Sequence, residues 1–173
     1  VNGSPHEAGT GARALGSVRE ILENRGLLCE WHSLREYRSE GCRACRACAS
    51  GDGCIFGDIS DLSKSFNDAA GLIVAAPVYY GSPNGSVIAL LDRLFQSSKF
   101  EKRNKVGAAI VTARRGGATA SFDVLNKYFS ISQMPIATSS YWNTVHTHED
   151  SEGERTVRQL AENFADLVFA INK

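Results

Sequence analysis

Short apolar runs alternate along this chain with longer stretches of helical periodicity. The run over residues 72–76 has the length and apolar character of a buried strand, and it stops at Pro77. After a short loop, apolar side chains recur at helical spacing on one face: Val87, Leu90, Leu91, Leu94 and Phe95. A buried strand that leads through a turn into a helix is half of a βαβ unit.

The same pattern extends over most of the chain. It predicts further strands at residues 27–34, 105–112 and 134–138, and helices at residues 11–24, 59–69, 121–129 and 153–171. Alternating strands and helices indicate one α/β domain over residues 1–173, with a doubly wound parallel sheet between two helical layers. We expect five strands in the order 2-1-3-4-5. The first strand would be central, and most of it would lie upstream of Val1.

Composition narrows the function classes. Of 173 residues, 43 % are apolar and 22 % are charged, which is ordinary for a globular protein. The net charge is zero, so nothing indicates a nucleic-acid surface or the strongly acidic surface of an electron carrier. No apolar run has the length of a membrane span. Five cysteines, four of them crowded together, favour a reducing compartment such as the cytoplasm.

The first ten residues have the composition of an anion site. Small and hydroxylated residues follow Asn2 and lead directly into a predicted helix, whose N-terminus would present N–H groups and a positive dipole end. The loop has neither the nucleoside-triphosphate P-loop motif nor the dinucleotide glycine motif. A monophosphate therefore fits better than a triphosphate or a dinucleotide. The alternative is an ordinary loop with a helix cap.

Three ordered motifs give a resemblance over nearly the whole chain. They are NGSP with Thr10 behind it, APVYYGSPNG followed by LDR, and RRGGATASFD. Together they resemble the NADPH-dependent FMN reductase group of flavodoxin-like proteins, and within it the multimeric flavodoxins and iron–sulfur flavoproteins. The resemblance implies a flavodoxin-like sheet, FMN bound without a covalent link, and assembly into homodimers or homotetramers.

Within these motifs we expect three loops to surround FMN. The first would hold the phosphate, the second would border the ring, and the third would bring glycine backbone and arginine charge close to the ring. The expected residues are Ser4, Pro5, His6, Thr10, Gly11 and Ala12 in the first loop, Pro77, Val78, Tyr79, Tyr80, Gly81 and Ser82 in the second, and Thr112, Arg114, Arg115, Gly116 and Gly117 in the third. Strand alternation predicts that one of the two tyrosines points inward and the other outward. No protein acid or base is expected to be catalytic, because the flavin carries the chemistry.

A second group of candidate functional residues lies in the predicted loop over residues 36–58. Its four thiols follow the pattern Cys42-x2-Cys45-x2-Cys48-x5-Cys54, which can wrap one [4Fe–4S] cluster. The pattern resembles the compact cysteine motif of iron–sulfur flavoproteins. Free or disulfide-prone thiols are an open alternative. Structural zinc is a weaker one, because zinc sites more often use two separated pairs.

Several other residues are candidates for smaller roles. Cys29 is predicted to be a packing residue, and Asp92 with Arg93 to form a structural ion pair or an interface contact. The segment from Tyr141 to His146 resembles the family loop that covers a flavin from a neighbouring subunit. His148 has no convincing partner in the sequence.

These observations favour an FMN-dependent oxidoreductase that moves electrons from NAD(P)H to a quinone, a flavin or another small acceptor. The alternative is an electron carrier of the flavodoxin or iron–sulfur flavoprotein type that docks to protein partners. A third hypothesis, a metal-binding protein that has lost flavin, is disfavoured by the intact phosphate and ring motifs.

Overall fold

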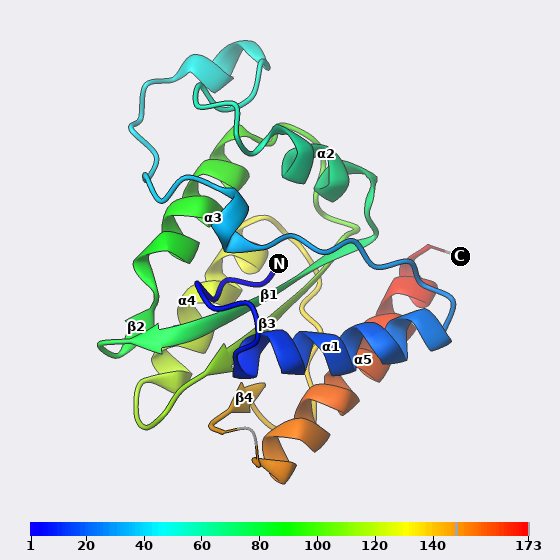
Figure 1. Ribbon diagram of the computed structural model, residues 1–173. Helices are drawn as coiled ribbons and strands as arrows, with labels where there is room; N and C mark the ends of the chain where they lie inside the picture. Colours follow the sequence, from blue (N-terminus) through cyan, green and yellow to red (C-terminus); the bar gives the residue numbers. More distant parts are fainter. Residues whose placement is uncertain (148, 173) are drawn as a thin grey trace.

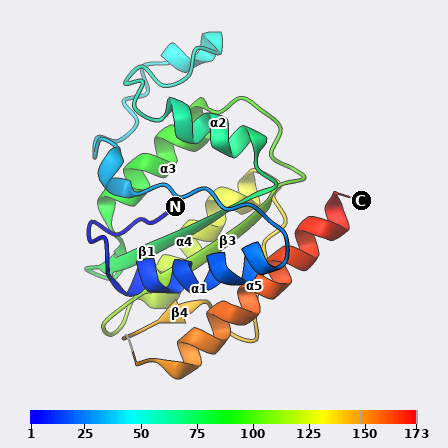
Figure 2. The same cartoon turned by 45° about the vertical axis from the view of Figure 1, so that its right-hand side comes forward.

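A sheet runs through the middle of the molecule, with helices on both of its faces (Figure 1). The computed structural model describes residues 1–147 and 149–172, so His148 lies outside the described residues. Helices α1 (Thr10–Asn24) and α5 (Ser151–Ile171) lie side by side on one face (Figure 2). Helices α2 (Ser60–Asp68), α3 (Gly85–Ser97) and α4 (Ala118–Ile131) cover the other face. The expected three-layer α/β arrangement is therefore present.

The sheet has four strands in the order β2-β1-β3-β4 among the described residues. Strands β1 (Gly71–Tyr79) and β3 (Val106–Thr112) are parallel, and β4 (Thr144–Val145) pairs in parallel with the end of β3. Strand β2 (Ser82–Pro83) is antiparallel to β1. Because β1 and β3 are parallel, their carboxyl ends meet at one edge of the sheet, which is where ligands bind in open α/β sheets.

The helices form where predicted because each carries one apolar stripe. In α1 the stripe is Ala14, Leu15, Val18, Ile21 and Leu22, and in α5 it runs from Val157 to Val168. These two stripes pack together on one face of the sheet, and the apolar stripes of α2, α3 and α4 pack on the other. Strand β3 is buried on both faces, which explains its continuous apolar sequence.

The prediction of five parallel strands is wrong in two places, the first of which is residues 27–34. This segment forms no strand: Leu28 is 99 % exposed, and only Asn2 pairs with it. The backbone N–H of Asn2 donates to His32 (2.8 Å), and Leu34 donates to Asn2 (2.9 Å). Asn2 also bridges to Ala75 of β1, and Val1 and Gly3 hydrogen-bond to the same strand, so residues 1–3 stand where a central strand was expected. A strand needs a ladder of hydrogen bonds, and Asn2 alone does not supply one to residues 27–34.

Because residues 26–32 do not pair with the sheet, a space remains beside them. A cavity of about 450 Å³ lies between residues 26–32, α1, α2 and the amino end of β1. A 3₁₀-helix, η1 (Leu34–Glu36), then begins and leads into the cysteine loop, which contains a second one, η2 (Ala47–Ser50).

The second wrong strand is residues 134–138. Only Ile136 bridges to β3, through Gly107, and Pro135 has no N–H with which to extend the ladder. Further along β3, the side-chain Nδ2 of Asn143 donates to the Ala109 carbonyl (3.0 Å), and the backbone carbonyl of Asn143 accepts from the N–H of Val111 (2.8 Å). The backbone groups along this edge of β3 are therefore paired first by the bridge from Ile136, then by Asn143 and finally by the short β4.

The expected loop after residue 76 is instead a β-hairpin. Strand β1 continues to Tyr79, and Tyr79 pairs with Ser82 across a two-residue turn. Tyr80 and Gly81 both have positive φ, at 51° and 81°, which is the conformation of the two central residues of a type I′ hairpin. No helix among the described residues is both long and apolar enough to cross a membrane.

A substitution at Gly107 tests the close packing of β3 against α4, because this glycine lies against the Phe129 ring. An added Cβ would lie 2.5 Å from Cγ of Phe129, so Gly107→Ala forces the ring or the strand to move. We expect a loss of about 1–3 kcal/mol in the free energy of unfolding, measured by urea denaturation. The matched control is Gly16→Ala on the exposed face of α1, where a Cβ meets nothing within 4 Å. It should stabilise by about 0.5–1 kcal/mol. Equal effects of the two substitutions would contradict this packing.

Candidate functional site

The first loop is held against the carboxyl end of β1 by its own backbone. The N–H of Gly3 donates to the Ala75 carbonyl (2.7 Å), and the Asn2 side-chain oxygen accepts from the N–H of Ser4 (3.1 Å). The hydroxyl of Ser4 accepts from the N–H of His6 (3.1 Å). Asn2 and Ser4 are buried, whereas Pro5 and His6 are exposed. The loop is therefore built inward at its start and open to solvent at its tip.

Helix α1 begins directly behind this loop. Its N-cap is Gly9, which has no side chain to cap the first turn, and the first turn of an α-helix carries N–H groups without intrahelical partners. Gly11 lies where the three segments meet. A Cβ there would be 3.8 Å from a methyl of Thr112 and 3.9 Å from Ala75. The N-terminus of α1 is thereby placed over Ala75 of β1 and the carboxyl end of β3, with the dipole favouring an anion.

The second and third loops touch each other. Gly117, with φ of 93°, is the N-cap of α4, and a Cβ on it would lie 2.6 Å from the Cα of Gly81 and 3.0 Å from Val78. Only glycine fits both the space and the backbone angle. The hairpin presents its tyrosines outward: Tyr79 is 45 % exposed and Tyr80 is fully exposed. The prediction that one tyrosine points inward is therefore wrong, because the turn ends the strand alternation at Tyr79.

The remaining predicted residues occupy the same edge of the sheet. Thr112, paired with Pro77 in the β1–β3 register, ends β3 and is partly buried. Arg114, Arg115 and Gly116 form the exposed tip of the third loop. Ser82 is exposed, and Ala12 and Val78 are partly buried. All three predicted loops are thus brought together, by backbone and glycine contacts.

Two asparagines that the site prediction missed support these loops. Asn84 is 3 % exposed, and its Oδ1 has no hydrogen-bond partner among the described residues. It follows the hairpin, and its N–H donates to Pro77 (3.0 Å). Asn143 is fully buried and fixes the segment with Tyr141 and Trp142, whose rings lie 4.9 Å apart and are both exposed. An asparagine between apolar segments is the sequence signal for such a role, but sequence alone does not show its partner.

The segment before α5 is held by Asp150. Its carboxylate accepts from the N–H of Gly153 and from the N–H of His146, both at 2.8 Å. Burial would raise the pKa of Asp150, but these backbone hydrogen bonds outweigh it and hold the pKa below its ordinary value. A ring nitrogen of His146 lies 2.8 Å from the carbonyl of Ala113, so this histidine packs beside the end of β3.

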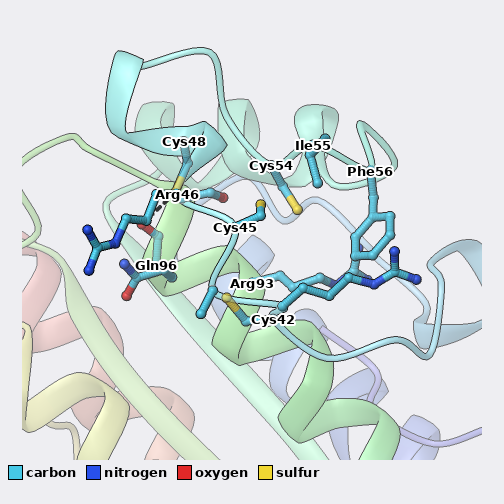
Figure 3. Close-up of a pocket in the computed structure, with 12 residues that line it drawn as sticks. Cys42, Cys45, Arg46, Cys48, Cys54, Ile55, Phe56, Arg93 and Gln96 are labelled. Carbon is cyan, nitrogen blue, oxygen red and sulfur yellow. Dashed lines mark hydrogen bonds between the residues drawn. The ribbon is translucent and has the colours of Figure 1, made fainter.

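The four clustered cysteines line one cavity of about 270 Å³ along the carboxyl-terminal half of α3. In Figure 3, Cys42, Cys45 and Cys54 point into the cavity, and Cys48 is turned toward Gln96, whose carbonyl lies 3.7 Å from its sulfur. All are free thiols. No three Cys, His, Asp or Glu side chains among the described residues are close enough to hold a single metal ion. Structural zinc, which needs four ligands on one ion, therefore has no formed site here.

The cysteine loop is wound tightly. Ala44 and Arg46 have φ of 52° and 61°, and Gly51, Gly53 and Gly57 are left-handed as well. A left-handed residue without a glycine's freedom is uncommon, so the loop sequence is held in this shape by its surroundings. Such turns direct backbone N–H groups toward the inside of a concave loop, which suits an anion.

A buried ion pair lies at the base of this loop. Arg93 of α3 is 1 % exposed and donates to Asp58 (2.5 Å) and to the Arg38 carbonyl (2.7 Å). Burial would raise the pKa of Asp58, but the hydrogen bonds from Arg93 and from the N–H of Arg38 hold the pKa below its ordinary value.

Arg93 forms the expected structural ion pair, with Asp58 and not with its sequence neighbour Asp92. Asp92 accepts instead from the Tyr128 hydroxyl at 2.5 Å. The signal for the role of Arg93 was a charge on the apolar stripe of a helix, three residues after Leu90. The partner, Asp58, is distant in sequence and could not be read from that pattern. Cys29, the fifth cysteine, is half-buried and lines the cavity beside residues 26–32.

Comparisons with known proteins agree with this geometry. The model of the NADPH-dependent FMN reductase family matches residues 1–149. An iron-sulfur flavoprotein of Methanosarcina thermophila is 29 % identical over 184 residues, which cover 100 % of this chain and 95 % of that protein. An iron-sulfur flavoprotein of Methanocaldococcus jannaschii is 27 % identical, with 100 % and 97 % covered.

Solved structures share the flavodoxin-like fold. FerB, a flavoenzyme NAD(P)H:(acceptor) oxidoreductase of Paracoccus denitrificans, has a TM-score of 0.69 at 15 % identity, covering 98 % of this chain and 94 % of that one. A flavodoxin, WrbA-like protein of Agrobacterium tumefaciens has a TM-score of 0.65 at 13 % identity, covering 98 % and 94 %. At these identities the likeness concerns the fold alone.

The Asp58–Arg93 pair predicts a pH-dependent stability. Because folding lowers the pKa of Asp58, its contribution is complete above the ordinary value of 3.8 and is lost as the pH falls through the folded value. Asp58→Asn leaves the Arg93 charge buried and should cost about 3–5 kcal/mol at neutral pH. Urea denaturation from pH 7 to pH 3 should show this gap closing below about pH 4. Glu40→Gln, in an exposed pair 4.0 Å from Arg38, is the control and should show almost no gap. A gap that is constant down to pH 3 would refute the role of the ionised carboxylate.

Proposed function

Since the chain belongs to the NADPH-dependent FMN reductase family and is an FMN-dependent oxidoreductase, we propose that it takes electrons from NAD(P)H and passes them to a quinone, a free flavin or another small acceptor. The observation that carries the proposal is the meeting of three loops at the carboxyl ends of β1 and β3. FMN, when bound, supplies the hydride and electron chemistry through its ring. The chain's residues bind it, orient it and set the charge around it.

The first loop suits the phosphate of FMN. Ser4 and Thr10 bring hydroxyl groups to the N-terminus of α1, where Gly11 and Ala12 belong to the first turn and add backbone N–H groups. The N-cap residue, Gly9, has no side chain with which to cap this end. Hydrogen bonds from these groups to a phosphate are charge-assisted, and each is worth roughly 1.5–3 kcal/mol.

The second and third loops suit the ring. The hairpin offers the exposed faces of Tyr79 and Tyr80, and Gly81 and Gly117 keep the two loops in contact without side chains between them. Arg114 and Arg115 at the tip of the third loop would favour negative charge on the reduced ring. No protein acid or base is needed for this role.

We include assembly into a homodimer or homotetramer in the proposal. Tyr79, Tyr80, Tyr141 and Trp142 are all exposed, and large exposed aromatic groups are typical of interfaces. A neighbouring subunit seated on these loops would cover the ring. The free thiols favour a reducing, cytoplasmic location.

Substitution of Gly117 tests whether the contact between the second and third loops contributes to ring binding. Gly117→Ala places a methyl 2.6 Å from Gly81 at a φ of 93°, so the two loops must part. FMN binding must then bring the two loops back together at a cost of about 1–2 kcal/mol, which lowers FMN affinity roughly tenfold. Gly116→Ala is the matched control, because a Cβ there meets nothing within 4 Å. Fluorescence titration of FMN into apoprotein measures both variants. Equal affinities would remove the third loop from the ring site.

The cysteine cavity adds a second redox group to the proposal. Four thiols around one cavity, with a concave loop backbone and the buried Nε of Arg93 lacking a partner among the described residues, fit an anionic [4Fe–4S] cluster. Each thiolate of such a cluster binds a different iron, so the four sulfurs need not meet at one ion. The alternative is four free or disulfide-prone thiols.

A second function is an electron carrier between protein partners. The observation that favours it is the position of Arg43 and Arg46, both exposed beside the thiols, where they would steer an anionic partner toward a cluster. Neutral net charge over the whole chain argues against long-range steering.

One set of measurements tests these functions. Visible spectra of protein purified without air, oxidised and then reduced, report flavin and iron–sulfur absorbance together. Steady-state oxidation of NADH and NADPH with a quinone or free FMN then distinguishes the enzyme from the carrier. We expect bound FMN and multiple turnovers with at least one small acceptor. Bound FMN without turnover would favour the carrier, and a spectrum without flavin would refute both.

A further inference from the structure

Arg93 joins the two ends of the cysteine loop. Its guanidinium donates to Asp58, at the end of the loop, and to the carbonyl of Arg38, at its start. The N–H of Arg38 also donates to Asp58 (2.8 Å), so three groups close the base of the loop. Both ends of the segment that carries the four thiols are thereby fixed to one residue of α3.

Arg93 keeps one buried donor without a partner although its charge is paired with Asp58. The residue is 1 % exposed and lines the cysteine cavity, and its Nε has no hydrogen-bond partner among the described residues. The Phe56 ring, whose centroid is 5.4 Å from the guanidinium carbon, covers it on one side. A buried N–H without a partner is costly, and a native structure that keeps one usually provides for a ligand or a water.

Figure 3 shows where Arg93 lies relative to the thiols. The Arg93 side chain runs from α3 beneath the loop toward Phe56, and Cys42 lines the same cavity. Arg43 and Arg46 also line the cavity, but both are exposed, so water screens their charge. Arg93 is the cavity arginine that water does not screen.

We propose that Arg93 is a positioning residue for an anionic iron–sulfur cluster, fixing the cysteine loop at its base and placing a buried positive charge against the cluster. The inference rests on the proposed cluster. A cluster that gains an electron becomes more negative, so a buried cation beside it stabilises the reduced form and raises the reduction potential. Removing that charge should lower the potential.

The test uses the full FMN-loaded chain, reconstituted with iron and sulfide without air. Arg93→Met alone leaves Asp58 unpaired, so the main variant is Asp58→Asn/Arg93→Met, which removes both charges. We expect it to fold and to shift the one-electron equilibrium of the cluster at least tenfold toward the oxidised form, about 59 mV in an EPR-monitored titration. It should also lose iron to a chelator faster than the wild type.

Two single variants separate charge from anchoring. Arg93→Lys keeps the charge but loses the planar fork that holds both Asp58 and Arg38, so it should keep a potential near that of the wild type while losing iron faster. Arg46→Met removes one positive charge at an exposed position of the same cavity. It should shift the potential far less than the double variant.

The outcomes distinguish the two proposals. A wild-type chain that takes up no cluster overturns both. A wild-type chain that takes one up, with a double variant of unchanged potential and chelator resistance, overturns the role of Arg93 and leaves the cluster intact. An equal shift of the reduction potential in Arg46→Met and in the double variant overturns the claim that burial gives Arg93 a larger effect on the potential than an exposed arginine has.

Discussion

The parallel ladder between β1 and β3 is the interaction on which the rest of the molecule depends. It runs in register from Gly71 opposite Val106 to Pro77 opposite Thr112, and both helical layers pack on it. Parallel pairing places both carboxyl ends at one edge, so the hairpin and the third loop emerge side by side there. Gly117 then rests against Gly81 without an intervening side chain. The phosphate loop joins them because Gly3 hydrogen-bonds to Ala75 of the same ladder.

Helix α3 connects this edge to the cysteine cavity. It starts at Gly85, just behind the hairpin, and its later turns carry Arg93 and Gln96 against the cavity. A rise of about 1.5 Å per residue puts Gln96 about 16 Å along the helix from Gly85. The loop that lines the cavity projects from the molecule above α2 and α3 (Figures 1 and 2). The two candidate redox sites are therefore separate within one subunit but share one rigid element.

Much of the fold and of the candidate site could be predicted because it depends on local pattern. The five α-helices of the described residues follow from apolar stripes at helical spacing, and β3 follows from a continuous apolar run. The three loops could be found because glycines, hydroxyls and tyrosines stand at predicted strand ends. The crowding of four cysteines in the loop before α2 was also visible, since chain connectivity alone keeps their side chains near one another.

What the sequence by itself determined about this protein is therefore its layered α/β class, its helices, and which residues stand near the ligand-binding edge. Only the tertiary structure decided which extended segments become strands, because a strand needs a partner and, among the described residues, Asn2 alone forms a bridge with the segment around Ser33. It also decided that Asn143, by its side chain, replaces a ladder bond on β3, and that Arg93 pairs with Asp58 rather than Asp92. These contacts join residues far apart in the chain, and their energy depends on burial and on distance in space, which no local pattern contains.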